Sequence, residues 1–170
     1  MPRDQCPGCG ALLPDDPNGP HHAYVITSSG CWEAFSRLSA REFEDPAWST
    51  EHRLSVDTYM AQHPDGDDRR QRQSVAVHLI ALCHRLEHDL DPATLLAATR
   101  SLASHRDWPR LEPVPRGYRL TVLDVLEART PAQHAGLVQA WAEGTWSAWS
   151  EHHPTIRGWA DASLAAVRHA

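Results

Sequence analysis

The stretch from Trp48 to Leu90 constrains the fold more than any other part of the chain. Apolar residues recur in it at helical spacing on both sides of an acidic, glycine-containing turn. The first helix is expected to open at Asp45-Pro46, because proline is tolerated in a first turn, and to end at His63-Pro64. The second is expected from near Gln71 to Leu90. On the first helix, histidines share the apolar face, which indicates a site as well as packing.

Capping residues mark further helix starts along the chain. Ser28-Ser29-Gly30 precedes a helix with Cys31 in its first turn, Asp91-Pro92 starts another, and Thr130-Pro131-Ala132-Gln133 is a capping box. Together these signals predict helices at about 31–43, 46–63, 71–90, 92–104, 121–128, 131–151 and 155–167. The expected fold is therefore all-α, a bundle of six or seven helices with a small zinc-knuckle-like loop at the N-terminus.

The length and net charge of the chain limit its domain count and its possible partners. The 170 residues are expected to form a single domain, with an irregular knuckle and tether at 1–30 and the helical bundle at 31–170. A net charge of −6 and the lack of a basic stripe argue against nucleic acid as a partner. The sequence has neither an apolar run near the roughly 20 residues that span a bilayer nor a signal peptide. We therefore expect a cytoplasmic protein with reduced cysteines and no membrane partner.

The N-terminal cysteines have the pattern of a zinc knuckle. In Cys6-Pro-Gly-Cys9-Gly the tight turn lets two thiolates face one ion, and zinc prefers four tetrahedral nitrogen or sulfur ligands. Cys31 is the expected third ligand, because the N-terminus of a helix favours a thiolate. We therefore predict a zinc site with a histidine as its fourth ligand. The candidates are His21, His22, His63 and the later histidines, with His22 and His63 foremost.

Two other interpretations of the cysteine pair remain open. A redox dithiol normally opens a helix after a strand, whereas Pro7-Gly8 lies in a loop. Alternatively, the two cysteines are incidental residues of an irregular terminus. Cys83 is different, because it lies among leucines on one face of its helix and is expected to be a small core residue.

The histidines of the helix at 46–63 cannot share one ion. Its apolar stripe contains His52 and His63, and a helix rises about 1.5 Å per residue, so the two lie roughly 16 Å apart along the axis. We therefore assign His63 to the cysteine knuckle and His52 to a pocket in the middle of the bundle. Asp57 points away from the stripe and is expected to pair with Arg53 or Arg69. The stripe itself consists of Trp48, His52, Val56, Tyr59 and His63.

Two later helices also place histidines beside their core faces. On the helix at 71–90, His78 lies at the edge of a leucine stripe, whereas His84 and His88 lie on the far side and are expected to be exposed. On the helix at 131–151, His152 continues the buried face at its end. That face consists of His134, Val138, Trp141, Thr145 and Trp149.

The chain resembles a family of uncharacterised bacterial proteins, known as a domain of unknown function. The resemblance rests on the blocks CPGCGA, HAY, GCW, HRLSVDTYMAQHP, QSVAVHLIALC and WSAW-x-x-HH, from about Cys6 to Trp159. Ser29 departs from the pattern, which has proline before Gly30-Cys31. The resemblance supplies no activity. It implies only that the residues in these blocks occur together. They include Cys6, Cys9, His22, Cys31, His52, Asp57, Tyr59, His63, Gln73, His78 and His152.

The sequence thus predicts a metal-binding helical protein, with zinc as its cofactor, and leaves its activity open. One hypothesis is a metalloenzyme whose pocket, lined by His52, Tyr59, His78 and His152, performs acid–base or metal-assisted chemistry on a small-molecule ligand. The other is a non-enzymatic binding or adaptor module with a purely structural zinc, in which these histidines fill the core or cap helices.

Overall fold

The computed structural model describes residues 3–14, 16–64, 66–88, 90–102, 105 and 107–168. Within them the all-α prediction is confirmed, because seven α-helices account for nearly all the regular structure. The elements are β1 (Arg3–Gln5), β2 (Leu12–Pro14), α1 (Ser29–Glu44), η1 (Ser49–Glu51), α2 (His52–Gln62), α3 (Arg69–Glu87), α4 (Pro92–Ser101), α5 (Val122–Leu126), α6 (Pro131–Ala148), η3 (Ser150–His152) and α7 (His153–Arg168).

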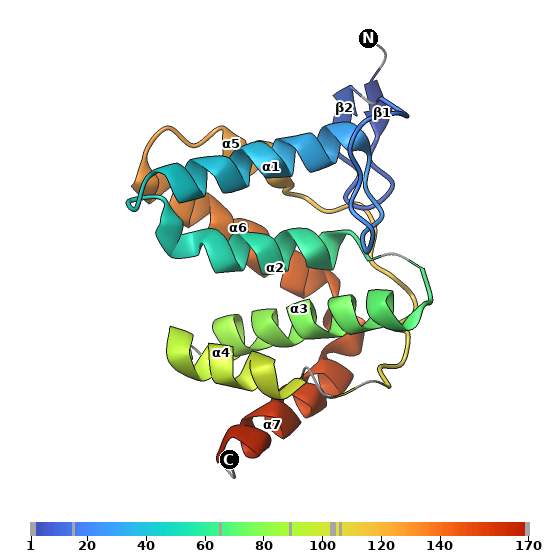
Figure 1. Ribbon diagram of the computed structural model, residues 1–170, viewed down its shortest axis with the longest axis vertical. Coiled ribbons are helices and arrows are strands. Elements are labelled where there is room, and N and C mark those ends of the chain that lie inside the picture. The colour runs from blue at the N-terminus through green and yellow to red at the C-terminus, as the bar shows by residue number, and fades with distance from the viewer. Residues whose placement is uncertain are drawn as a thin grey trace.

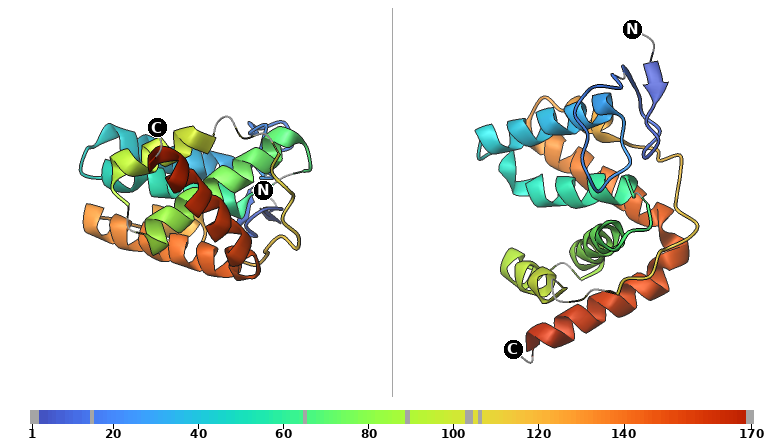
Figure 2. Two further views of the ribbon diagram at one scale, coloured as in Figure 1. Left: turned by 90° about the horizontal axis from the view of Figure 1, so that it is seen from below. Right: turned by 45° about the vertical axis from the view of Figure 1, so that its right-hand side comes forward.

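The helices are stacked along an elongated molecule. The β1–β2 hairpin and α1 lie at the N-terminal end, and α4 and α7 lie at the opposite end with the C-terminus (Figure 1). Between them, α2 packs against both α3 and α6, while α3 also packs against α7 (Figure 2). None of the described helices has the length and apolar character that a membrane span needs.

Side-chain caps explain why most helices begin where the sequence predicts. Ser28 accepts a hydrogen bond from the Cys31 amide at the start of α1. Asp68 and Gln71 form a reciprocal capping box at the start of α3. Thr130 caps α6, and Pro131 occupies the first position of that helix. The predicted end of one helix at Ser104 lies outside the described residues.

The first turn of the predicted helix at 46–63 is not α-helical. The Asp45 carboxylate accepts from the Ala47 amide, and the Ser49 hydroxyl donates to the Pro46 carbonyl. These side chains satisfy the backbone locally, so a turn and η1 precede α2, which starts at His52.

The central helices are buried on more than one side, which the single-stripe prediction missed. Leu54 and Asp57 are buried although they lie off the predicted stripe of α2, because α3 covers that side. The prediction that His84 is exposed is wrong, since α7 covers the far side of α3 and leaves His84 1% exposed. Cys83 is a buried core residue, as predicted.

The N-terminal segment is more regular than predicted. Arg3–Gln5 pairs antiparallel with Leu12–Pro14, with Asp4 opposite Leu13. The hairpin lies directly on the first turn of α1. A Cβ atom on Gly30 would come within 2.0 Å of the Pro14 carbonyl oxygen, so this close approach requires glycine.

A long connection, residues 107–120, ties the two ends of the molecule together and is named the strap. It runs along one side of the stack, from α7 towards α5 (Figure 2). Its Pro113 carbonyl contacts His152 Nε2, and its Tyr118 hydroxyl donates to the Ala61 carbonyl. Gln62 of α2 donates to the Leu120 carbonyl. The strap therefore holds the C-terminal end of α2 against the junction of α6 and α7.

Candidate metal centre

Three cysteines and one histidine meet at the junction of the hairpin, α1 and α2. One ligand atom from each of Cys6, Cys9, Cys31 and His63 lies within 4.8 Å of all the others. The Sγ atoms of Cys9 and Cys31 are 3.7 Å apart, and Cys31 Sγ is 3.4 Å from His63 Nε2. All four residues are at most 2% exposed. They come from three separate segments of the chain.

The loop between β1 and β2 is shaped to present Cys6 and Cys9 on one side. The Cys6 amide donates to the Ala11 carbonyl, and the Gly10 amide donates to the Cys6 carbonyl. Gly10 has φ +85°, a conformation that favours glycine immediately after the second cysteine. The tight hairpin therefore closes with both sulfurs facing inward.

His63 is held in one orientation at the C-terminal end of α2. Its Nδ1 lies 2.6 Å from the Tyr59 carbonyl oxygen, which can only accept, so Nδ1 carries the proton. In the neutral ring, the lone pair then belongs to Nε2, which faces Cys31. Metal-binding histidines commonly have their other nitrogen fixed in this way. The Ile26 amide also donates to the His63 carbonyl, which joins the tether before α1 to α2.

Hydroxyl groups surround the sulfur atoms. Tyr59 donates to Cys31 Sγ at 3.6 Å, and its oxygen lies 2.9 Å from Thr27 Oγ1. Thr27 Oγ1 is also 3.8 Å from Cys6 Sγ. The Tyr59 ring is stacked between Phe35 and His63, with ring centroids 4.0 Å away on either side. This packing fixes its hydroxyl beside the sulfurs.

The electrostatics of the cluster favour a bound cation. Hydrogen bonds with Cys31 and Cys9 lower the pKa of Cys6, whereas hydrogen bonds with Cys31 and Cys6 raise the pKa of Cys9. Burial acts to lower the pKa of His63, but the neighbouring sulfurs outweigh it and raise that pKa to about 9. Several buried thiolates repel one another, and a divalent cation would relieve that repulsion.

Residues 4–150 match the family of unknown function DUF5946. The chain belongs to this family. The match confirms the resemblance to an uncharacterised family. No curated protein and no solved structure matches the chain.

Of the two foremost histidine candidates in this DUF5946 protein, only His63 joins the cysteines. His22 lies outside the group of four. Its Nδ1 accepts from the Tyr24 amide, and its ring packs against Trp32 at a centroid distance of 4.9 Å. The structure therefore places His22 apart from the cysteines. His63 is favoured because the end of α2 passes directly beneath the knuckle, a tertiary contact that spacing alone does not reveal.

The four residues predicted to line one catalytic pocket have separate surroundings. His52 Nδ1 lies 2.7 Å from a Glu42 carboxylate oxygen, and His78 Nδ1 lies 2.7 Å from Asp57. The Asp57 carboxylate also pairs with Arg53, as predicted. His152 contacts the strap, and Tyr59 belongs to the cysteine cluster. The described residues thus bring Tyr59 to the candidate metal centre and leave the three histidines apart from it and from one another.

A buried carboxylate at the end of α1 was not predicted. Glu42 is fully buried and accepts from Ser55 at 2.5 Å, with His134 Nε2 2.9 Å away on the same oxygen. Burial lowers the pKa of His134, although the Glu42 carboxylate opposes that shift. The sequence did carry a signal, because Glu42 continues the buried face of α1 at helical spacing from Cys31, Phe35 and Leu38.

Proposed function

We propose that Cys6, Cys9, Cys31 and His63 bind one zinc ion, and that this metal has a structural role. The observation that carries the proposal is the spacing of the ligand atoms. With zinc–sulfur distances near 2.3 Å and zinc–nitrogen distances near 2.0 Å, tetrahedral ligand atoms lie roughly 3.5–3.8 Å apart. The distances of 3.7 Å between Cys9 and Cys31 and 3.4 Å between Cys31 and His63 are close to these values.

The closed character of the site supports a structural metal over a catalytic one. A catalytic zinc normally keeps one position for water or substrate, whereas four protein ligands complete the tetrahedron here. The ligands are buried and come from the hairpin, α1 and α2. Zinc would therefore fasten the N-terminal hairpin to the helices, where two short strands alone are marginally stable.

The other interpretations of the cysteines have less support. A redox dithiol needs access to its partner thiols, but Cys6 and Cys9 are 2% and 1% exposed. An incidental pair would not explain why Cys31 and His63 are directed at the same point. The predicted enzyme pocket is also less well supported, since its histidines pair separately with Glu42, Asp57 and the strap.

Metal analysis of untagged protein, purified without chelators, tests the proposal. We expect about one zinc per chain, because the four ligands complete a single tetrahedral site. Cobalt added to reduced metal-free protein should give the thiolate-to-cobalt charge-transfer bands of a tetrahedral sulfur-rich site. Less than about half an equivalent of zinc, together with no cobalt spectrum, contradicts the proposal.

A matched pair of cysteine variants assigns the metal to this cluster. The Cys6→Ser/Cys9→Ser double variant should lose the zinc. Cys83→Ser should retain it, because Cys83 is equally buried but lies in the core of α3 beside Glu87. Equal loss of zinc in both variants would count against this assignment.

A further inference from the structure

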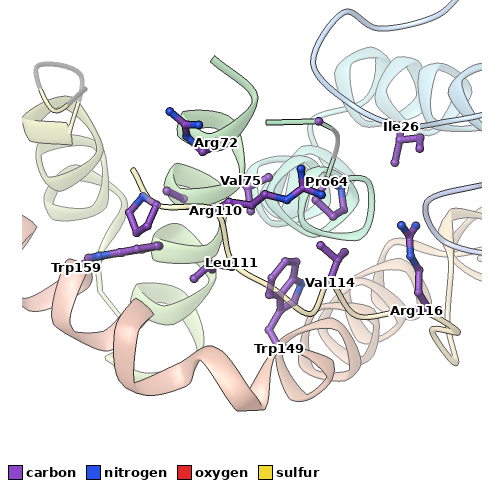
Figure 3. Close-up of a pocket in the computed structure, with 13 residues that line it drawn as sticks. Ile26, Pro64, Arg72, Val75, Arg110, Leu111, Val114, Arg116, Trp149 and Trp159 are labelled. Atoms are coloured by element: carbon purple, nitrogen blue, oxygen red, sulfur yellow. The ribbon is translucent and has the colours of Figure 1, made fainter. Parts of the chain in front are cut away.

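A cavity of about 130 Å³ lies beneath the strap, between the strap and the helices α3, α6 and α7. Figure 3 shows it in close-up, with the Arg110 side chain extending towards Pro64. Three arginines and two tryptophans are prominent in its wall. The arginines are Arg72, Arg110 and Arg116, and the tryptophans are Trp149 and Trp159.

The charge on the cavity wall is positive. Within the described part of the chain, the lining residues include three arginines and no aspartate or glutamate. Arg72 pairs with Asp67 and Arg110 with Glu112, but these carboxylates lie outside the cavity on exposed side chains. Such surface ion pairs contribute only about 0–1 kcal/mol, so an anionic ligand could displace them. Arg116 donates to the Pro7 carbonyl. The wall therefore attracts an anion although the whole chain carries −6.

One donor on this wall lacks an acceptor. The Nε atom of Arg72 is buried and has no hydrogen-bond partner among the described residues. Buried donors are nearly always paired, so this unpaired donor on a cavity-lining arginine is free to bind an acceptor supplied by water or a ligand. Guanidinium groups present a planar set of donors that matches the oxygens of phosphate or carboxylate.

The remaining wall is apolar and held in place. The Trp149 indole donates to the Ala61 carbonyl at 3.1 Å, which fixes its ring at the floor of the cavity. Trp159 packs edge-on against Trp108 at a centroid distance of 5.1 Å. Leu111 and Val114 of the strap complete this side. A ligand with an apolar or aromatic group beside its anionic head would contact both kinds of wall.

We propose that this cavity binds a small organic phosphate ester. A phosphate carries about −1.5 to −2 charges and three acceptor oxygens, which suits several guanidinium groups better than a single carboxylate does. The volume of about 130 Å³ is well below the roughly 300–1,000 Å³ of pockets for drug-sized ligands, so the ester is small. The proposal goes beyond the zinc site, because none of the described residues that line the cavity belongs to the group of candidate metal ligands.

Isothermal titration calorimetry on the zinc-loaded protein tests the proposal with three probes. Phenyl phosphate combines both features, inorganic phosphate lacks the ring, and benzyl alcohol lacks the charge. We expect saturable binding of phenyl phosphate that is tighter than that of the other two. Lack of saturable phenyl phosphate binding at millimolar concentration, or equal affinity for benzyl alcohol, overturns the proposal. Equal affinity for inorganic phosphate would overturn the role of the apolar wall.

Arginine variants locate the binding. Arg110→Gln/Arg116→Gln should weaken phenyl phosphate binding at least roughly tenfold, through the loss of charge-assisted hydrogen bonds. Arg129→Gln is the matched control, because Arg129 is exposed beyond α5 and does not line the cavity. The zinc content of each variant is measured in parallel, since Arg116 contacts the knuckle. Unchanged binding in the zinc-loaded double variant overturns the proposal. Loss of zinc by Cys6→Ser/Cys9→Ser tests the metal separately.

Vesicles distinguish a free ester from a lipid headgroup. The large exposed apolar side chains Leu12, Phe43 and Leu96, which could insert among acyl chains, are not among the described residues that line the cavity. We therefore expect no cosedimentation with phosphatidic-acid vesicles. Cosedimentation that the arginine double variant abolishes would overturn the assignment to a free ester.

Discussion

Gly8 packs directly against the ring of His63 in the candidate metal centre. A Cβ at this position would lie 2.4 Å from His63 Cδ2 and 2.5 Å from the Ile26 carbonyl oxygen. Gly8→Ala should therefore displace the His63 ring, lower the zinc content and destabilise the fold by about 1–3 kcal/mol. Gly144→Ala is the control, since nothing lies within 4 Å of its Cβ, and alanine in mid-helix should stabilise α6 by about 0.5–1 kcal/mol. Thermal unfolding and zinc analysis compare the two. Equal behaviour would contradict the close packing at Gly8.

The Tyr59 hydroxyl is expected to strengthen zinc binding by orienting a ligand sulfur atom. It donates to Cys31 Sγ and contacts Thr27, and burial is the main cause that raises its pKa. Tyr59→Phe should retain the fold but weaken zinc affinity by about tenfold, as for other groups that orient metal ligands. Competition with a chromophoric chelator measures the affinity. Tyr24→Phe is the control, because that hydroxyl pairs with Arg70 at the surface. An unchanged affinity in Tyr59→Phe would leave this hydroxyl with only a packing role.

At the scale of an element, the β1–β2 hairpin is expected to depend most on the proposed zinc. Each strand has three residues, and such a hairpin is marginal alone. Chelation of zinc should therefore speed hydrogen exchange at the Cys6 and Gly10 amides by about tenfold or more, whereas amides in the middle of α6 remain protected. Hydrogen exchange followed by mass spectrometry or NMR measures this. Equal acceleration in α6 would mean that the metal holds the whole bundle, and no acceleration would contradict its structural role.

The helix α2 links the two proposed sites. Its end supplies His63 to the cysteine cluster, and Pro64, the next residue, lines the arginine cavity. Gln62 donates both to the strap and to Thr145 of α6. Because these contacts lie within one helical turn, a displacement of the backbone at either site would also shift the residues of the other.

At the scale of the molecule, local signals predicted the elements but not the contacts between them. Caps such as Ser28 and Thr130 act within one turn, so they could be recognised from the sequence. The Cys6-x-x-Cys9 spacing likewise predicted half of the candidate metal site. The sequence also assigned His63 to the knuckle but kept His22 as an alternative. The choice between these two histidines, the burial of His84 and the arginine cavity depend on which helix covers which face. A single stripe cannot reveal that α7 covers the back of α3.

Burial of His84 should make the whole fold sensitive to acid. Burial is the main cause that lowers the pKa of His84 to about 4, and nearby His88 lowers it further. An unfolded histidine has a pKa near 6.5, so the unfolded chain binds more protons between pH 6.5 and 4. Stability is therefore complete above about pH 6.5 and falls as the pH decreases through this window, by about 3 kcal/mol from this residue. Urea unfolding at pH 7 and pH 4.5 measures the fall.

The matched variant is His84→Leu, which removes the titrating ring while Ser163 keeps its hydrogen bond to the Ala160 carbonyl. It should lose less free energy of unfolding between the two pH values than the unmodified protein, because only the latter must exclude a proton from this position. His88→Gln should retain most of the loss seen in the unmodified protein, because burial, the main cause of the lowered His84 pKa, is unchanged in it. Acid release of zinc affects all three proteins alike and cancels in the comparison. A loss in His84→Leu as large as that in the unmodified protein would show that the acid sensitivity has another source.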